Sequence, residues 1–185
     1  MRNRIYKALF TNIRSILILA IFMMLSFSCF SQNDVFDVCR TGSLDDITKL
    51  YKADKNVINL INDNGYSALT LACYSGNEEV VAFMVDKVET LNSISKFGSP
   101  LMAAVVKGKI NIVKLLLKYK AEVNTADAQG ITALHYATMF KQTEIVKMLI
   151  NAGADANLKD GNGKTALNHA ETLEENNIID ILKNR

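Results

Sequence analysis

The side chains that could carry chemistry are few and lie far apart in this chain of 185 residues. It holds two histidines, His135 and His169, and neither an H-E-x-x-H nor an H-x-x-x-H spacing that would bring two of them to one metal ion. No G-x-S-x-G, P-loop or G-x-G-x-x-G motif occurs. We therefore expect no enzyme activity, no cofactor and no metal. The alternative is an enzyme, or an enzyme accessory protein of the cell envelope, that uses His135 and nearby carboxylates.

A repeated unit must position these side chains. Four leucines recur at spacings of 32, 33 and 33 residues, and four asparagines each precede a glycine by six residues in the same register. The leucines are Leu69, Leu101, Leu134 and Leu167, and the asparagines are Asn59, Asn92, Asn124 and Asn157. Such a period indicates supersecondary units that stack on one another, because no single unit can bury its apolar side alone.

This pattern resembles the ankyrin repeat, whose units carry D-x-x-G-x-T-P-L-H-x-A. The stretch from Asp127 to Ala137 matches best, with Ala133 in place of the proline. The unit around Pro100 departs most, since one residue is missing between Gly98 and Leu101, and we expect its loop to be distorted. A degenerate first unit precedes the four, in which Val35 stands where Leu69 stands in the next. The resemblance covers about residues 34 to 185.

The resemblance implies an all-α repeat fold: an ankyrin-type α-solenoid of about five helix-turn-helix units with short β-hairpin-like finger loops between them. The repeat domain runs over 32–185, with units near 34–61, 62–94, 95–126, 127–159 and 160–185. The residues agree with this reading. Thr132 and Thr165, with Ser67 and Ser99, stand where a helix needs an N-cap. Segments such as "TEIVKMLINA" are apolar at helical spacing, as second helices require.

In this alignment of the repeats, the histidines and two of the cysteines have structural roles. In the family the histidine at the position of His135 hydrogen-bonds between neighbouring finger loops, and we expect His169 to be structural too. Cys39 and Cys73 occupy equivalent positions in adjacent units. Stacked helices lie about 10 Å apart, whereas a disulfide needs Cα atoms within about 7 Å. We therefore expect two unbonded, buried thiols.

The first 31 residues differ from the rest and are typical of a secretory signal peptide. Four basic residues and no acid precede an apolar run near Ser15–Phe27, which is shorter than the roughly 20 residues that a membrane span needs. Small residues follow, with cleavage expected after Ser28 or Ser31. The predicted location is the periplasm or the cell exterior. A leader lipidated at Cys29, or a membrane anchor formed by residues 1–29, is the alternative.

The charge balance argues against a nucleic-acid partner. The leader holds four of the 21 basic residues and none of the 19 acidic ones, so 17 basic residues remain and the rest of the chain has a formal charge of −2. That balance offers phosphates no excess positive charge. Contact with a membrane would involve the N-terminal segment alone.

We expect a monomer that binds another protein, as an exported adaptor, through its finger tips and the concave face of its first helices. In ankyrin-like arrays the variable surface positions lie at the finger turn and at the end of each first helix. Several of them here are large and apolar, as docking surfaces often are. The predicted partner-binding residues are Tyr66, Tyr74, Phe97, Val106, Lys107, Ile131, Met139 and Phe140.

Overall fold

The computed structural model describes residues 35–95 and 98–184. The expectations for the leader, for Cys29 and for Phe97 lie outside these residues. In the described part of the chain, no helix combines the length and the apolar character that crossing a bilayer requires.

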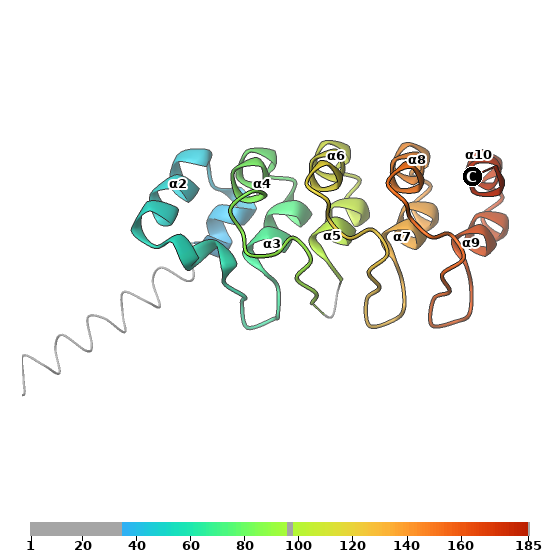
Figure 1. The fold of residues 1–185 in the computed structure, drawn as a ribbon, viewed down its shortest axis with the longest axis horizontal. Helices are drawn as coiled ribbons and strands as arrows, with labels where there is room; N and C mark the ends of the chain where they lie inside the picture. Colours follow the sequence, from blue (N-terminus) through green and yellow to red (C-terminus); the bar gives the residue numbers. More distant parts are fainter. Residues whose placement is uncertain (1–34, 96–97, 185) are drawn as a thin grey trace, which may run out of the picture. The chain divides into compact units, whose positions relative to one another are not determined.

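Antiparallel helix pairs follow one another in a row, with long loops projecting to one side (Figure 1). First helices contact first helices and second helices contact second helices, from α3 through α5 and α7 to α9 and from α2 through α4, α6 and α8 to α10. The predicted all-α repeat solenoid is confirmed. In chain order the elements are a helix at 35–41, α2 Leu44–Ala53 with the 3-10 turn η1 Lys55–Asn59, α3 Ala68–Ser75, α4 Glu78–Met84, α5 Pro100–Val106, α6 Ile110–Lys118, α7 Ala133–Met139, α8 Thr143–Asn151, α9 Ala166–Thr172 and α10 Asn176–Lys183.

The finger loops before α3, α5 and α7 are narrow hairpins closed by single β-bridges. Two of them join residues six apart, Ile61 to Ser67 and Ala126 to Thr132. The loop before α5 is bridged between Ser95 and Gly98, three residues apart, so the expected distortion of this finger is present. Its cause is the residue missing before Leu101, which leaves too little chain for the wider bridge.

Hydroxyl side chains start the first helices, as predicted. Ser67, Ser99, Thr132 and Thr165 cap α3, α5, α7 and α9, and each accepts the backbone N–H three residues ahead. Each bond satisfies an N–H that the helix itself leaves without a partner. Before α7, Gly130 turns the finger with a φ of 72°, and a Cβ there would lie 3.0 Å from the backbone nitrogen of Gly161. Glycine suits this turn on both counts.

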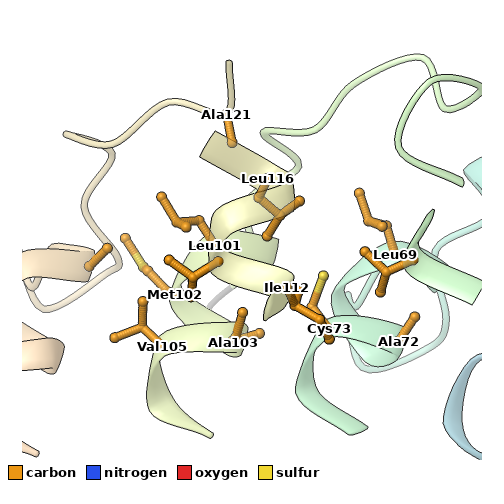
Figure 2. Packing of buried hydrophobic residues seen from close by; sticks show 14 of the residues in the cluster. Leu69, Ala72, Cys73, Leu101, Met102, Ala103, Val105, Ile112, Leu116 and Ala121 are labelled. Carbon is orange, nitrogen blue, oxygen red and sulfur yellow. The ribbon is translucent and has the colours of Figure 1, made fainter. Parts of the chain in front are cut away.

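The core is a continuous strip between the two rows of helices. Leu69, Leu101 and Leu134 are each 1% exposed, and Figure 2 shows Leu69 and Leu101 on consecutive units. Leu167 is half-buried, because α9 has a first helix packed against it on one side only. The second helices α4, α6 and α8 bury the same three positions, such as Ile112, Val113 and Leu116 in α6, whereas the terminal helix α10 buries two of them. Stacking therefore supplies the burial that a lone helix pair lacks.

Cys39 and Cys73 are free thiols in this strip, and both are fully buried. The sulfur of Cys39 lies 4.0 Å from the sulfur of Met84. Burial raises the pKa of Cys39 to about 12 and raises that of Cys73 as well. Both side chains act as small apolar residues rather than as reactive thiolates.

The recurring asparagines join one unit to the next. The side-chain oxygens of Asn59 and Asn92 each accept a backbone N–H from the end of the following unit, at 2.9 Å. Asn124 does the same with Asp155 at 2.8 Å, and its amide also donates to the carbonyl of Gly153. The period seen in the sequence is thus a row of hydrogen bonds across the unit boundaries.

Replacing one of these asparagines should weaken the stack. We predict that Asn124→Ala lowers the free energy of unfolding in urea by about 1–2 kcal/mol, because two hydrogen bonds between units are lost. Asn151→Ala is the control, since Asn151 is exposed at the end of α8 and the substitution favours helix. Equal stability of the two variants would show that the asparagine row does not hold the units together.

Candidate functional site

The repeat arranges side chains of the first helices in columns. We call the solvent side of these helices, together with the finger loops that precede them, the inner face. Positions two residues after the anchor leucine place Leu71, Ala103 and Tyr136 in one column. Positions five residues after it place Tyr74, Val106 and Met139 in a second column, which Arg40 in the helix 35–41 extends.

A hollow of about 570 Å³ opens on this inner face. Its walls are mainly aromatic and aliphatic, and its lining comes from the helix 35–41, from α3, α5 and α7, and from two finger loops. The lining residues are Arg40, Tyr66, Thr70, Leu71, Tyr74, Ser75, Ala103, Val106, Gln129 and Tyr136.

Small side chains on α5 account for the position of the hollow. In the first column Ala103 lies between Leu71 and Tyr136, and in the second Val106 follows Tyr74. The methyl group of Ala103 and the short side chain of Val106 leave space that the larger neighbours on α3 and α7 border. The hollow therefore forms because these side chains on α5 are smaller than their counterparts on α3 and α7.

Hydrogen bonds fix the wall that Tyr136 forms. Its hydroxyl donates to Oδ2 of Asp127 at 2.6 Å, and Oδ1 of Asp127 accepts the backbone N–H groups of Gln129 and Ile131 at 2.9 Å. Burial, and then the bond to Asp127, raises the pKa of Tyr136 to about 12. The ring is thus a neutral wall held by the finger loop, and it stands in place before any partner arrives.

Two further contacts extend the wall outward. The ring of Phe140 stacks on Tyr136, with 6.3 Å between centroids and 8° between planes. On the other side Nζ of Lys107 lies 4.5 Å from the centroid of the Tyr74 ring, within the range of a cation–π contact. Phe140 is 49% exposed and Tyr74 is 48% exposed, so both offer a large apolar surface to solvent.

The structure brings most of the predicted binding residues together around the hollow. Tyr66, Tyr74 and Val106 line it, and Lys107 and Phe140 contact its walls. Ile131 and Met139 are half-buried and do not line it, and Phe97 lies outside the described residues.

Sequence reasoning missed several residues of this face. Tyr136 is one of them, since its ring packs against the core and also lines the hollow. Arg40 escaped notice because it belongs to the degenerate first unit, although it stands five residues after Val35 as Tyr74 does after Leu69. Two finger-loop residues at equivalent positions, Ile61 and Ile94, are 56% and 59% exposed.

The geometry of His135 excludes it from acid–base chemistry at the surface. Nδ1 faces the backbone N–H of Thr132 at 3.2 Å, which can only donate, and Nε2 lies 3.1 Å from the carbonyl of Lys164, which can only accept. The ring is therefore the neutral tautomer with its proton on Nε2. Both nitrogens are in use and the side chain is 1% exposed. The expected role between neighbouring finger loops is confirmed.

His169 also serves a finger loop. Its Nε2 lies 2.7 Å from Oδ2 of Asp160, whose Oδ1 accepts the N–H groups of Asn162 and Lys164. The backbone bond from Lys164, followed by the bond to His169 and then the one from Asn162, lowers the pKa of Asp160 to about 2. One unit earlier Tyr136 and Asp127 make the same arrangement, 33 residues away. A tyrosine can replace the histidine in that arrangement, so the pair closes a loop and needs no catalytic explanation. Within the described residues, no group of three or more His, Cys, Asp or Glu side chains could hold a metal ion.

Comparisons with known proteins agree with the geometry of the repeat. A family model described as ankyrin repeats in three copies matches residues 35–127 and 101–185. Ankyrin repeat and SAM domain-containing protein 6 of Rattus norvegicus is 30% identical over 102 residues, which are 54% of this chain and 12% of that protein.

Two other curated relatives match shorter stretches. Ankyrin repeat and KH domain-containing protein mask of Drosophila melanogaster is 40% identical over 67 residues, 36% of this chain and 2% of that protein. B-cell lymphoma 3 protein homolog of Mus musculus is 35% identical over 79 residues, 42% of this chain and 18% of that protein. The chain spans less than a fifth of the length of each of these three relatives, so the likeness concerns their repeats alone.

His135 should make the stability of the stack depend on pH. Burial is the largest cause that lowers the pKa of His135 below its usual 6.5, and the nearby His169 ring, 5.8 Å away between centroids, lowers it further. As the pH falls, His135 therefore binds a proton at a higher pH in the unfolded chain than in the folded one. We predict that the free energy of unfolding falls as the pH drops from 7.5 to 5.5.

Urea unfolding at several pH values checks this, and His135→Gln should show a shallower dependence than the wild type. Asp160 does not interfere, because its stabilising contribution is present above its unfolded value of 3.8 and is lost only as the pH falls toward 2. An identical slope in wild type and variant would contradict the role given to His135.

Proposed function

The chain belongs to the ankyrin repeat family, and on that premise we propose that it is a non-catalytic binding module that holds a protein partner against its inner face. Ankyrin repeats generally mediate protein–protein interaction. The observation that supports this site is the hollow between Tyr74 and Tyr136, with exposed aromatic rings at its border. Soluble proteins rarely leave such surface open without a partner for it.

The composition of the border also suits a protein partner. Tyrosine and phenylalanine are enriched at the centres of interfaces, where they bury a large area at little cost in side-chain entropy. Here Tyr66, Tyr74, Tyr136 and Phe140 gather on one face, and the last two are stacked. The finger residues Ile61 and Ile94 offer additional apolar surface.

A catalytic function has less support. It would need a titratable group free to exchange a proton with a substrate. His135 is buried with both nitrogens bonded, and the carboxylates of Asp127 and Asp160 hold finger loops. These groups maintain the fold that carries the inner face.

We also propose that the protein acts outside the cytoplasm, as a monomer. The proposed location rests on the basic and apolar character of residues 1–31. N-terminal sequencing of the chain recovered from producing cells tests it. A start after Ser28 or Ser31 would indicate an exported form, and a start at Met1 would indicate an anchored or a cytoplasmic form.

Loss of the exposed rings should abolish partner capture without unfolding the protein. We predict that the double variant Tyr74→Ser with Phe140→Ser retains its helical circular dichroism. In a pull-down, the amount of partner recovered should fall at least about tenfold, because central aromatic residues usually contribute most of the binding free energy.

The matched control is Leu44→Ser with Tyr119→Ser. Leu44 and Tyr119 are 44% and 39% exposed but belong to the second-helix row, at the start of α2 and the end of α6. Equal loss in both double variants, or equal capture by wild type and the inner-face variant, would refute this placement of the site.

A further inference from the structure

The shape of the hollow selects the form of its occupant. Its lining comes from four consecutive first helices, the helix 35–41, α3, α5 and α7. Neighbouring packed helices lie about 8–10 Å apart, so the lining crosses roughly 25 Å. An extended peptide advances about 3.3 Å per residue, and some eight residues would cover this distance.

The centre of the hollow suits an apolar side chain of the ligand. Ala103 and Val106 on α5 form its small-residue centre, and Tyr74 and Tyr136 border them on either side. The hydroxyl of Tyr136 is already bonded to Asp127, so its ring presents apolar surface. A bulky aliphatic or aromatic side chain fills such a site with the largest gain from burial.

The charge of the lining calls for a carboxylate. Arg40 is the one ionised residue of the lining. The ammonium of Lys107 lies over the ring of Tyr74, which also lines the hollow. The nearby carboxylate of Asp127 is occupied by two backbone N–H groups and the Tyr136 hydroxyl. Arg40 and Lys107 are therefore the cations at the hollow, and the carboxylate of Asp37 beside Arg40 offsets part of this charge.

Arg40 is available to a ligand. Its one hydrogen bond to the described residues runs from Nη1 to Oδ1 of Asp37 at 2.9 Å, and the two side chains are 44% and 74% exposed. Exposed pairs of this kind contribute little to stability. The guanidinium has five N–H donors in a planar fork and can bind a second carboxylate with the donors that remain.

We propose that the hollow recognises an extended acidic segment of a partner protein, which inserts one bulky apolar side chain between Tyr74 and Tyr136 and places an Asp or Glu against Arg40. Arg40 precedes Ala103 and Val106 by two units, about 16–20 Å at the spacing of packed helices. At about 3.3 Å per extended residue, the carboxylate therefore lies about five or six residues from the apolar anchor. The proposal rests on the proposed function and adds the chemistry of the partner.

Selection from a phage library of random 12-residue peptides on the full chain tests this chemistry. The expected peptides carry Phe, Tyr, Leu or Ile with an Asp or Glu about five or six positions away, and they bind more weakly as salt rises. Synthetic versions of the strongest peptides then give dissociation constants by fluorescence anisotropy. Enrichment of basic or uncharged peptides, or no enrichment, would overturn the proposal.

Two variants distinguish the contribution of the hollow to peptide affinity from that of the charge on Arg40. Ala103→Tyr introduces the residue that the next unit carries at this position, fills the hollow, and should weaken binding at least about twentyfold, as the loss of a central anchor does. Arg40→Gln should weaken binding about fivefold, and Lys118→Gln, on the last turn of α6, should leave it unchanged. Circular dichroism verifies folding, and Val106→Glu replaces Ala103→Tyr if that variant unfolds.

A double-mutant cycle tests the contact between Arg40 and the acid. Changing the peptide's acid to its amide should weaken binding to the wild type but have little further effect on Arg40→Gln. Additive losses would overturn the contact. If the partner protein is still captured through Tyr74 and Phe140 while the cycle is additive, the acidic-segment proposal fails and the proposed function stands. If that capture is also absent, both fail.

Discussion

Each helix pair of this protein can bury its apolar side only against the pair beside it. The first helices show this most clearly, since six of the eight residues of α3 are buried between its neighbours. The asparagine row and the bond from His135 to Lys164 cross the same boundaries. Polar bonds fix the distance and register between units, and apolar contacts supply most of the driving force. Every other feature of the protein depends on this stacking.

The hollow on the inner face is a consequence of that regularity. Because the units repeat at a fixed distance, side chains at one repeat position form a column, and a change of size within the column changes the surface. Ala103 and Val106 are small where Tyr74 and Tyr136 are large, and a hollow results. The carboxylates of Asp127 and Asp160 close the finger loops and orient the aromatic or imidazole ring behind them. Groups that look suited to catalysis thus hold the finger loops, and Asp127 also holds the ring of Tyr136 at the hollow.

The sequence predicted the parts of the structure that repeat. Leucines, asparagines, N-caps and second helices recur at fixed spacing, and each has one dominant physical role, so their positions could be read directly. The distortion of the finger loop before α5 was predicted because one residue is missing there. The hollow could not be predicted in this way, because it depends on the relative size of side chains in three different units. Tyr136 illustrates the difficulty: its sequence position indicates packing between units, whereas its bond to Asp127 shows the ring's second role as a wall. Arg40 was hidden by the weak pattern of the first unit.

Site-specific photo-crosslinking tests the central claim that the inner face is where a partner docks. A photoreactive phenylalanine analogue replaces either Phe140 on the inner face or Tyr119 at the end of α6, and both sites are exposed and aromatic. The account predicts that irradiation in producing cells yields a discrete covalent adduct from position 140 and none from position 119. An adduct from position 119 alone would contradict it, since the partner would then contact the row of second helices.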